Sequence, residues 1–362
     1  MEKEYGVAKV EWRRLEIAPH SGSEELVRYV CIPGYTLHMM SEADEERASQ
    51  ILAGAIILAI GVVGGAINIS ALLAIYRSPS FHNAFGMLCA SHLISDIGFL
   101  VPHIFWAAPA ELMGWPASMM LSTYADRIGQ LLALFCTVSL YSQLQISINR
   151  LVAILAPLSY NSLFSPKRTI YSIVLVWLIG LLRCSVYFLD GCTLVFKTIS
   201  FTWNQSNTPC GRLVAFYLEY VMGTTVCVIV IIVNTITFIM IYKHTKKLSA
   251  MSGSLEQVEA KMHKNNLNFF LQSFTKAALF AVALIIYFFV SKLATTKWET
   301  FLTRTVTWEV AHCVNGLIIF IFNDSFRKAI RYSFSTLGRK TTSNMQSSSG
   351  FNIATRSKSV PN

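Results

Sequence analysis

The chain has 362 residues, of which 53% are hydrophobic and only 14% are charged, and its mean hydropathy is positive. Soluble domains carry about a quarter charged residues, so this composition excludes an ordinary water-soluble protein. The formal net charge of +10 would suggest nucleic-acid binding in a soluble chain. Here the basic residues gather in segments between apolar runs, where they indicate membrane topology, so no nucleic-acid partner is expected.

Seven apolar runs approach or exceed the roughly 20 residues that a helix needs to cross a bilayer. Backbone polar groups in hydrocarbon must be satisfied within their own segment, so each run is predicted to be a helix. The predicted spans are 51–76, 84–108, 128–155, 170–189, 213–242, 270–293 and 301–322. The predicted fold class is therefore all-α, a membrane bundle of seven transmembrane helices.

Lysine and arginine in the connecting segments predict the direction of the chain. Arg150, Lys167 and Arg168 follow the third span, five lysines lie within 243–264, and the tail carries seven basic residues from Arg327 onward. Cytoplasmic segments carry the excess of basic residues, so the N-terminus is predicted outside and the C-terminus in the cytoplasm.

Two further features fit this orientation. Residues 41–50, just before the first span, are acidic, which suits the outer side. Asn204 begins an Asn-Gln-Ser glycosylation sequence in a predicted outer loop. The charged residues ahead of the first span offer no apolar signal-peptide core, so that span is expected to act as its own targeting signal.

Three parts of the chain are expected. Residues 1–50 are predicted to be a mobile extracellular tail, with a folded ligand-capturing element around Cys31 as the alternative. Residues 51–332 form the membrane domain. Residues 333–362 are rich in Ser, Thr and basic residues and are predicted to be a disordered cytoplasmic tail that accepts phosphate.

A small set of polar side chains falls inside the predicted spans, where such residues usually face the bundle interior. They are Asn68, Asp96, Glu219, Asn234, Glu309, His312 and Asn315. Glu219 and Asn234 are interpreted as helix–helix hydrogen-bonding residues. Asp96 lies at about mid-depth, so it must bind a cation or water, find a partner, or become neutral. We therefore expect a buried polar cluster around Asp96 that differs between two packings of the bundle.

Catalytic and metal-binding motifs do not emerge from the sequence. It contains no GxSxG elbow, HExxH motif, phosphate loop or Cys/His metal spacing. An enzyme is therefore not expected, and neither is a cofactor or a metal.

The loop between the fourth and fifth spans has the pattern of a hairpin. Cys192 and Cys210 bracket a run that alternates aromatic and β-branched residues. The outer side of a membrane is oxidising, so a disulfide between these two cysteines is the expected closure. Cys184 and Cys31 remain rival partners.

Several motifs together resemble a known family. They are Gly64 with Asn68, the stretch 78–91, the loop with Cys192, Trp203 and Cys210, the stretch 268–272, the stretch 305–312 with Gly316, and 322–327. Over about residues 54–330 the chain resembles the nematode serpentine receptors of class X (Srx), a branch of the rhodopsin-like G-protein-coupled receptors.

This resemblance implies roles for residues at the cytoplasmic side. Asn149 and Arg150 stand where rhodopsin-like receptors have an acid–arginine pair, with Pro157 following, so Arg150 would meet the G protein on activation. Asn149 replaces the acid that restrains the arginine. Asn315 begins the counterpart of the NPxxY motif, and 323–329 resembles the start of a short amphipathic eighth helix.

The resemblance also implies a role for the buried cluster. Asp96, Ser139 and Asn315 match positions that surround a sodium ion in rhodopsin-like receptors, with Asn68 nearby. His312 is an addition that could replace the ion by protonation. The sixth span lacks the CWxP motif, and no cysteine lies near Ala125 to tie the loop to the third helix, so the loop disulfide is expected to stay within the loop.

The ligand site is expected in the outer third of the bundle, beneath the loop. Candidate ligand-facing residues are His103, Trp106, Gln130, Leu132, Cys136, Thr305, Trp308 and Glu309. An apolar, uncharged mouth predicts a small hydrophobic or weakly polar chemical. No carboxylate on the third helix offers an anchor for an amine, so a biogenic amine is disfavoured.

The predicted function is therefore a G-protein-coupled chemosensory receptor of the plasma membrane, multi-pass, with sensory cilia as a further expected location. Its predicted partners are a small chemical ligand, a heterotrimeric G protein facing 243–264 and Lys276, the lipid bilayer, and arrestin-like and kinase proteins at the tail. The alternatives are a ligand-gated ion channel or a small-solute transporter, although the halves show no repeat. A non-signalling family member is a third possibility.

Overall fold

The structure is a computed structural model that describes Arg28–Tyr29, Met39–Met40, Glu42–Leu248 and Glu256–Phe322. The chain divides into two compact units, Met1–Ser49 and Gln50–Asn362. In the first unit, β1 (Arg28–Tyr29) pairs antiparallel with β2 (Met39–Met40). The predicted eighth helix, the tail and Cys31 lie outside the described residues.

Within the described residues, seven helical segments are long and apolar enough to cross a membrane. They are Ala43–Arg77, Ala84–Met113, Thr123–Leu155, Pro166–Phe188, Pro209–Lys243, Leu267–Leu293 and Lys297–Phe322. The predicted seven-helix, all-α fold is confirmed.

Most of these helices begin before the predicted apolar runs, because polar N-caps set their starts. The side chains of Ser122, Ser165 and Thr208 each accept a hydrogen bond from a backbone N–H of the first turn. Thr296 and Glu299 form a complete capping box. Such caps satisfy otherwise orphaned backbone donors, so a helix can begin several residues before its apolar stretch does.

The spans consist of several consecutive elements. The first is α1 (Glu42–Arg77), and the second joins α2 (Ala84–Pro102), η2 (His103–Ala107) and α3 (Ala108–Met113). The third and fourth are α5 (Thr123–Leu155) and α7 (Pro166–Cys184), which η3 (Ser185–Phe188) continues. The fifth joins α8 (Pro209–Leu213), η4 (Val214–Val221) and α9 (Met222–Leu248). The sixth is α10 (Glu256–Phe288) with η5 (Val290–Leu293), and the seventh joins α11 (Lys297–Phe301), η6 (Leu302–Val306) and α12 (Thr307–Phe322).

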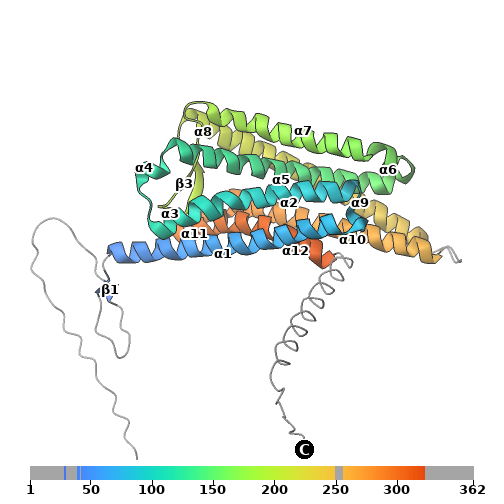
Figure 1. The fold of residues 1–362 in the computed structure, drawn as a ribbon, viewed down its shortest axis with the longest axis horizontal. Coiled ribbons are helices and arrows are strands. Elements are labelled where there is room, and N and C mark those ends of the chain that lie inside the picture. The colour runs from blue at the N-terminus through green and yellow to red at the C-terminus, as the bar shows by residue number, and fades with distance from the viewer. Residues whose placement is uncertain (1–27, 30–38, 41, 249–255, 323–362) are drawn as a thin grey trace, which may run out of the picture. The chain divides into compact units, whose positions relative to one another are not determined.

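Short elements mark the two ends of the bundle. The hairpin of β3 (Leu194–Lys197) and β4 (Thr202–Gln205) lies at the same end as α4 (Ala117–Met120), α8 and α11, which we call the hairpin end (Figure 1). The opposite end carries α6 (Pro157–Leu163), and we call it the α6 end. The short turn η1 (Pro79–Phe81) connects α1 to α2.

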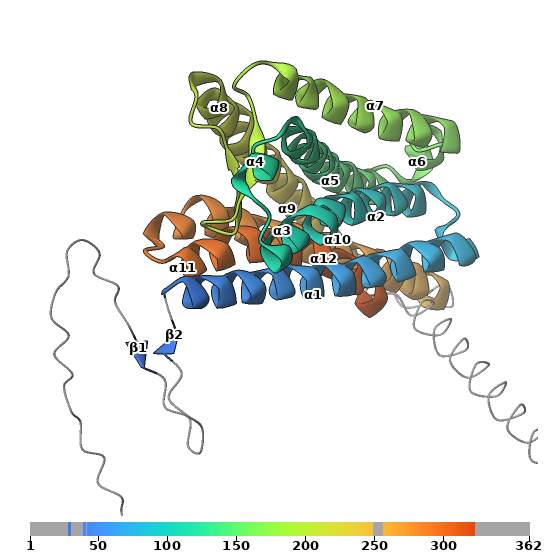
Figure 2. The same ribbon diagram turned by 60° about the vertical axis from the view of Figure 1, so that its left-hand side comes forward.

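Helix α5 is the central element of the bundle. It packs against α2, α7, α9, α10 and β3, and Figure 2 shows it among α2, α7 and α9. Its polar residues Ser139, Ser142 and Ser147 are fully buried, whereas apolar residues of α7 such as Leu178 and Leu182 point outward and are exposed. A helix surrounded by other helices can carry polar groups that a lipid-facing helix cannot, because neighbours supply hydrogen bonds.

The hairpin lies directly on α5. Strands β3 and β4 pair antiparallel, with Phe196 opposite Trp203. Gly129 of α5 meets the carbonyl oxygen of Leu194 so closely that a Cβ there would overlap it. The Cys192–Cys210 disulfide closes the loop, as predicted, and the rival Cys184 is a free, buried cysteine.

Candidate functional site

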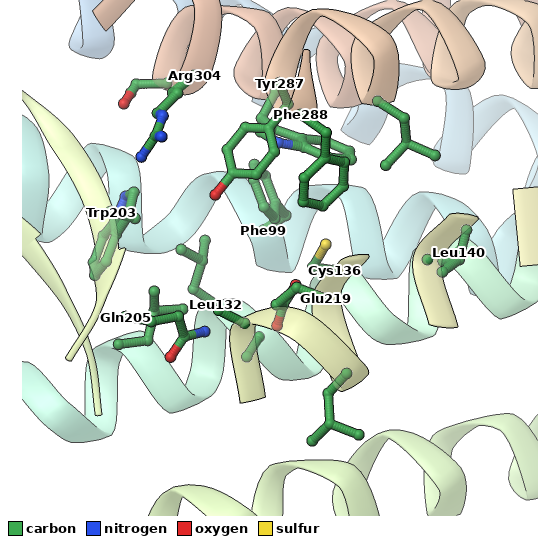
Figure 3. A pocket seen from close by; sticks show the side chains of 18 of the residues that line it. Phe99, Leu132, Cys136, Leu140, Trp203, Gln205, Glu219, Tyr287, Phe288 and Arg304 are labelled. Atoms are coloured by element: carbon green, nitrogen blue, oxygen red, sulfur yellow. The ribbon is translucent and has the colours of Figure 1, made fainter. Parts of the chain in front are cut away.

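A cavity of about 140 Å³ lies beneath the hairpin. Figure 3 shows Trp203 and Gln205 of β4 at one side of it, with Tyr287 and Phe288 of α10 opposite Leu132 and Cys136 of α5. Four other spans, the second, fourth, fifth and seventh, complete the wall. The remaining lining residues used below are Phe99, His103, Arg183, Glu219, Phe280, Arg304, Thr305 and Trp308.

The structure brings five of the predicted ligand-facing residues into the wall of this cavity. They are His103, Leu132, Cys136, Thr305 and Trp308. Trp106, Gln130 and Glu309 are absent from the lining, so these three lie outside the cavity that the prediction assigned to them.

Each of the three has a clear reason for its position. Trp106 lies in the π-helix η2 and packs edge-on against Trp115, with 5.1 Å between ring centroids. Gln130 Nε2 donates to the carbonyl oxygen of Cys184 at 2.8 Å, which ties α5 to α7. Glu309 is fully buried, and its carboxylate lies toward Gly61 of α1.

The cavity wall also contains charged side chains, and the sequence interpretation missed the arginines among them. Arg183 Nη2 and Glu219 Oε1 form an ion pair at 2.7 Å, and the Tyr187 hydroxyl donates to the same oxygen at 3.2 Å. Arg183 also donates to the carbonyl oxygen of Leu218 at 2.6 Å and to the Thr137 hydroxyl. The expectation of an uncharged mouth is therefore wrong. Arg183 stands in an apolar span, which is the signal that could have identified it.

A second arginine, Arg304 of η6, reaches the cavity from the seventh span (Figure 3). Its Nη1 donates to Asn204 Oδ1 at 3.2 Å, and its guanidinium lies 5.6 Å from the Tyr287 ring centroid. Asn204 Nδ2 donates to the Thr202 carbonyl oxygen at 3.0 Å. Asn204 is the residue of the predicted glycosylation sequence, and that modification stays a prediction.

Below the cavity lies a buried cluster centred on Asp96, whose carboxylate is fully buried. The Ser139 hydroxyl donates to Oδ1 at 2.9 Å, and Asn315 Nδ2 donates to Oδ2 at 3.0 Å. His312 Nδ1 lies 2.7 Å from Oδ1, and His92 Nε2 lies 3.5 Å from Oδ2. The structure thus brings Asp96, Ser139 and Asn315 together as the resemblance implied, together with His312, which was predicted as an addition, and with His92.

Asn68 belongs to the wall of the cluster and does not contact the carboxylate in the described structure. Its Nδ2 donates to the His312 carbonyl oxygen at 3.0 Å, and its Oδ1 accepts from the Gly316 N–H at 2.9 Å. Asn68 therefore holds α1 against α12 and fixes the backbone that carries His312.

The donors around Asp96 do not fit a sodium ion. Hard cations prefer oxygen ligands, whereas nitrogens of His312, Asn315 and His92 occupy the approaches to this carboxylate. Among the described residues, no group of His, Cys, Asp and Glu could hold a metal ion. The chain's own polar side chains surround Asp96.

Lys276 of α10 is also placed differently from the prediction. It is 2% exposed, and its Nζ has no hydrogen-bond acceptor among the described residues. It therefore lies inside the bundle and not on a cytoplasmic surface. The prediction placed Lys276 on the G-protein face together with 243–264, because sequence position alone does not tell which face of a helix is inward.

At the α6 end, two aromatic rings hold Arg150. Its guanidinium carbon lies 3.3 Å from the centroid of Phe85 on α2 and 4.6 Å from the centroid of Phe269 on α10. In the described part of the chain no carboxylate pairs with Arg150, which is only 6% exposed. Aromatic faces attract cations through their quadrupole, so the two rings can hold the guanidinium in place without a carboxylate.

The neighbouring Asn149 has a separate partner. Its Nδ2 donates to the Tyr160 hydroxyl of α6 at 3.1 Å. Pro157 occupies the first turn of α6, where a proline needs no N–H acceptor. Asn149 and Pro157 thus fix the turn that follows α5, while Arg150 points into the bundle.

Comparisons with known proteins agree with this architecture. A family model for the serpentine type 7TM GPCR chemoreceptors, Srx, matches residues 58–323. The chain is 25% identical to serpentine receptor class X 45 of Caenorhabditis elegans, over 78% of this chain and 81% of that protein. It is 25% identical to the 5-hydroxytryptamine receptor 2C of Homo sapiens, over 54% of this chain and 44% of that receptor.

Among solved structures, the fold is similar to that of squid rhodopsin. The TM-score is 0.67 at 17% identity, and the likeness covers 80% of this chain and 87% of that chain. The family model covers well over half of the sequence. The chain therefore belongs to the Srx family of serpentine type 7TM GPCR chemoreceptors and is a multi-pass membrane protein.

Proposed function

We propose that this receptor binds a small chemical from outside the cell, in the cavity beneath the hairpin, and activates a heterotrimeric G protein at its α6 end. Its family is one of receptors and not of enzymes. The proposal places the hairpin end outside and the α6 end in the cytoplasm, which the charge distribution of the sequence supports.

The observation that carries the proposal is direct contact between the cavity wall and the Asp96 cluster. The ring of Phe99 stacks on that of His312 with 3.8 Å between centroids, and Trp308 lies 6.1 Å from the same ring. Phe99 and Trp308 both line the cavity. A ligand that moves either ring therefore changes the position of His312, which contacts Asp96.

The same cavity wall joins the sixth and seventh spans. Trp308 packs edge-on against Phe280 and Tyr287 of α10, at 5.1 and 5.7 Å between centroids. A ligand that binds one arrangement of these rings better than the other shifts the equilibrium between two packings of α10 and α12. At the far end, movement of α10 would withdraw Phe269 from Arg150 and free the guanidinium for the G protein.

An amine ligand is not the proposal, although a 5-hydroxytryptamine receptor is among the similar proteins. The residues of α5 that line the cavity are Leu132, Ala133, Cys136 and Leu140, and none of them is a carboxylate. The one carboxylate in the cavity wall, Glu219, already pairs with Arg183. An ammonium group would find no uncompensated negative charge there.

Further parts of the proposal concern location and regulation. We expect the protein in the plasma membrane, with sensory cilia as the place where a chemoreceptor meets its ligand. Kinases and arrestin-like proteins are proposed to act on Ser and Thr of the tail, where phosphate would add negative charge.

A G-protein activation assay tests the proposal. Wild type, Arg150→Ala and the control Arg168→Ala are expressed with tags at both ends, and volatile and soluble chemicals are screened. Arg168 lies at the same end on α7, where its Nη1 donates to the Ser162 carbonyl oxygen. We expect a ligand response that Arg150→Ala abolishes and Arg168→Ala retains at equal surface level. An inside N-terminal tag, or a ligand-gated current that survives Arg150→Ala, would instead favour a channel.

A further inference from the structure

The charges of the cavity wall do not balance. Two arginines, Arg183 and Arg304, face it with one glutamate, Glu219. The ion pair at 2.7 Å joins Glu219 to Arg183, so these two charges compensate each other. The formal charge of Arg304 remains.

Arg304 is half-buried, and only some of its guanidinium donors have hydrogen-bond acceptors. In the described residues its Nη1 has a neutral amide acceptor, Asn204 Oδ1, while its Nε has none and no carboxylate lies within ion-pair distance. A guanidinium away from bulk water is costly unless an anion accepts its hydrogen bonds. The Tyr287 hydroxyl, beside Arg304, also points into the cavity without a hydrogen-bond partner from the described chain (Figure 3).

The remaining wall is mostly apolar and contains six aromatic side chains, and the volume of the cavity limits the size of the ligand. Phe99, Trp203, Phe280, Tyr287, Phe288 and Trp308 supply rings to it. An apolar protein cavity of roughly 150 Å³ holds one benzene molecule, and this cavity measures about 140 Å³. A one-ring compound is therefore the size that fits.

We infer that the cavity takes a small aromatic carboxylate, whose ring lies among the aromatic side chains and whose carboxylate accepts hydrogen bonds from Arg304 and Tyr287. The inference rests on the proposed ligand site and names the chemical class of its ligand. Guanidinium groups bind carboxylates through paired, charge-assisted hydrogen bonds, so Arg304 gives the site its preference for an acid over its neutral analogue. The Asn204 contact holds the guanidinium toward the cavity.

The test measures binding directly, by saturation-transfer NMR on the full chain in lipid nanodiscs. The probes are benzoate and phenylacetate, with benzamide, benzyl alcohol and benzylamine as uncharged and cationic analogues. Benzoate is expected to bind roughly ten- to a hundredfold more tightly than benzamide, the range for a hydrogen bond to a charged group. Equal binding of benzamide, preference for benzylamine, or no binding by either carboxylate would each overturn the inference.

Variants assign the effect to Arg304. Arg304→Met is expected to remove the preference for benzoate over benzamide, and Arg304→Lys is expected to keep part of that preference. Tyr287→Phe is expected to weaken benzoate binding severalfold. Arg212→Met is the matched control, because Arg212 is an exposed arginine at the same end that bonds the Asn207 carbonyl oxygen. Unchanged benzoate affinity in a folded Arg304→Met protein would overturn the assignment. If Arg304→Met does not fold, the inference is tested by the ratio of benzoate to benzamide affinity in the wild type and by the affinity of Arg304→Lys for benzoate.

Binding and signalling separate the two proposals. Carboxylate binding without G-protein activation would leave the ligand class standing and remove the signalling role. Activation by neutral compounds, with no carboxylate binding, would leave the receptor function standing and remove the ligand class.

Discussion

Replacement of Phe269 by leucine tests whether aromatic rings restrain Arg150 in the inactive packing. Leucine keeps an apolar side chain at this position of α10 but removes the ring face that lies 4.6 Å from the guanidinium carbon. Phe85, at 3.3 Å, stays in place on α2. The substitution therefore weakens the tie between α10 and Arg150 and leaves the tie to α2.

The expected size follows from the burial of Arg150, which is 6% exposed. Cation–π contacts contribute about 0.5–1 kcal/mol when exposed and about 2 kcal/mol when desolvated, and the more distant of two rings is assigned about 1 kcal/mol. That free energy corresponds to roughly a fivefold shift in the equilibrium between packings. Where the active packing is a minor state, basal activity should rise by nearly the same factor, about fivefold.

The assay is basal nucleotide exchange on the G protein, normalised to receptor at the cell surface. Phe274→Leu serves as the control, because Phe274 lies on the same helix but is 46% exposed. Adding Arg150→Ala to Phe269→Leu should abolish the increase. Basal activity within twofold of wild type at equal surface level, or an equal rise in Phe274→Leu, would refute the aromatic restraint.

Three other substitutions probe the buried polar contacts and the loop. Asp96→Asn removes the charge that accepts hydrogen bonds from the cluster, so ligand-driven signalling should change while surface level stays near wild type; loss of surface protein alone would indicate a structural role. Arg183→Met leaves Glu219 without its ion-pair partner and should lower the free energy of unfolding by about 2–3 kcal/mol. This loss is smaller than for a fully buried pair because Glu219 is partly exposed. The double change with Glu219→Gln should recover much of the thermal midpoint, and a double variant no more stable than Arg183→Met would contradict this. Paired replacement of Cys192 and Cys210 by serine should lower stability by roughly 3 kcal/mol, measured as a thermal shift that dithiothreitol reproduces in wild type and not in the variant.

The sequence by itself predicted the spans. Burying polar backbone or charged side chains in hydrocarbon is costly, so each spanning segment is a long, continuous apolar run that can be recognised from the sequence. The same holds for the closure of the loop, where Cys192 and Cys210 bracket one hairpin. The neighbourhood of Asp96, Ser139 and Asn315 came from the family resemblance, which carries a known helix arrangement that periodicity alone does not contain.

The composition of the cavity wall depended on the tertiary structure. Three spans contain a π-helix at the hairpin end, namely η2, η4 and η6. A π-helical turn inserts a residue and rotates the side chains beyond it, so a regular helical period misplaces Trp106. The sequence likewise did not show whether Lys276 faces the bundle interior or the outside, because its position in an apolar run fits both.

Pairings between distant segments were decided only by packing. Arg183 and Glu219 are 36 residues apart, and Arg304 and Asn204 are 100 residues apart. Nothing local to either residue specifies its partner, because the contact forms only when α7 meets the fifth span and when the hairpin meets η6. The pattern of hydrophobic residues along the chain thus determined which segments lie in the membrane. The uncompensated charge of Arg304 in the cavity was decided only by the tertiary structure, which determines which side chains face each other there.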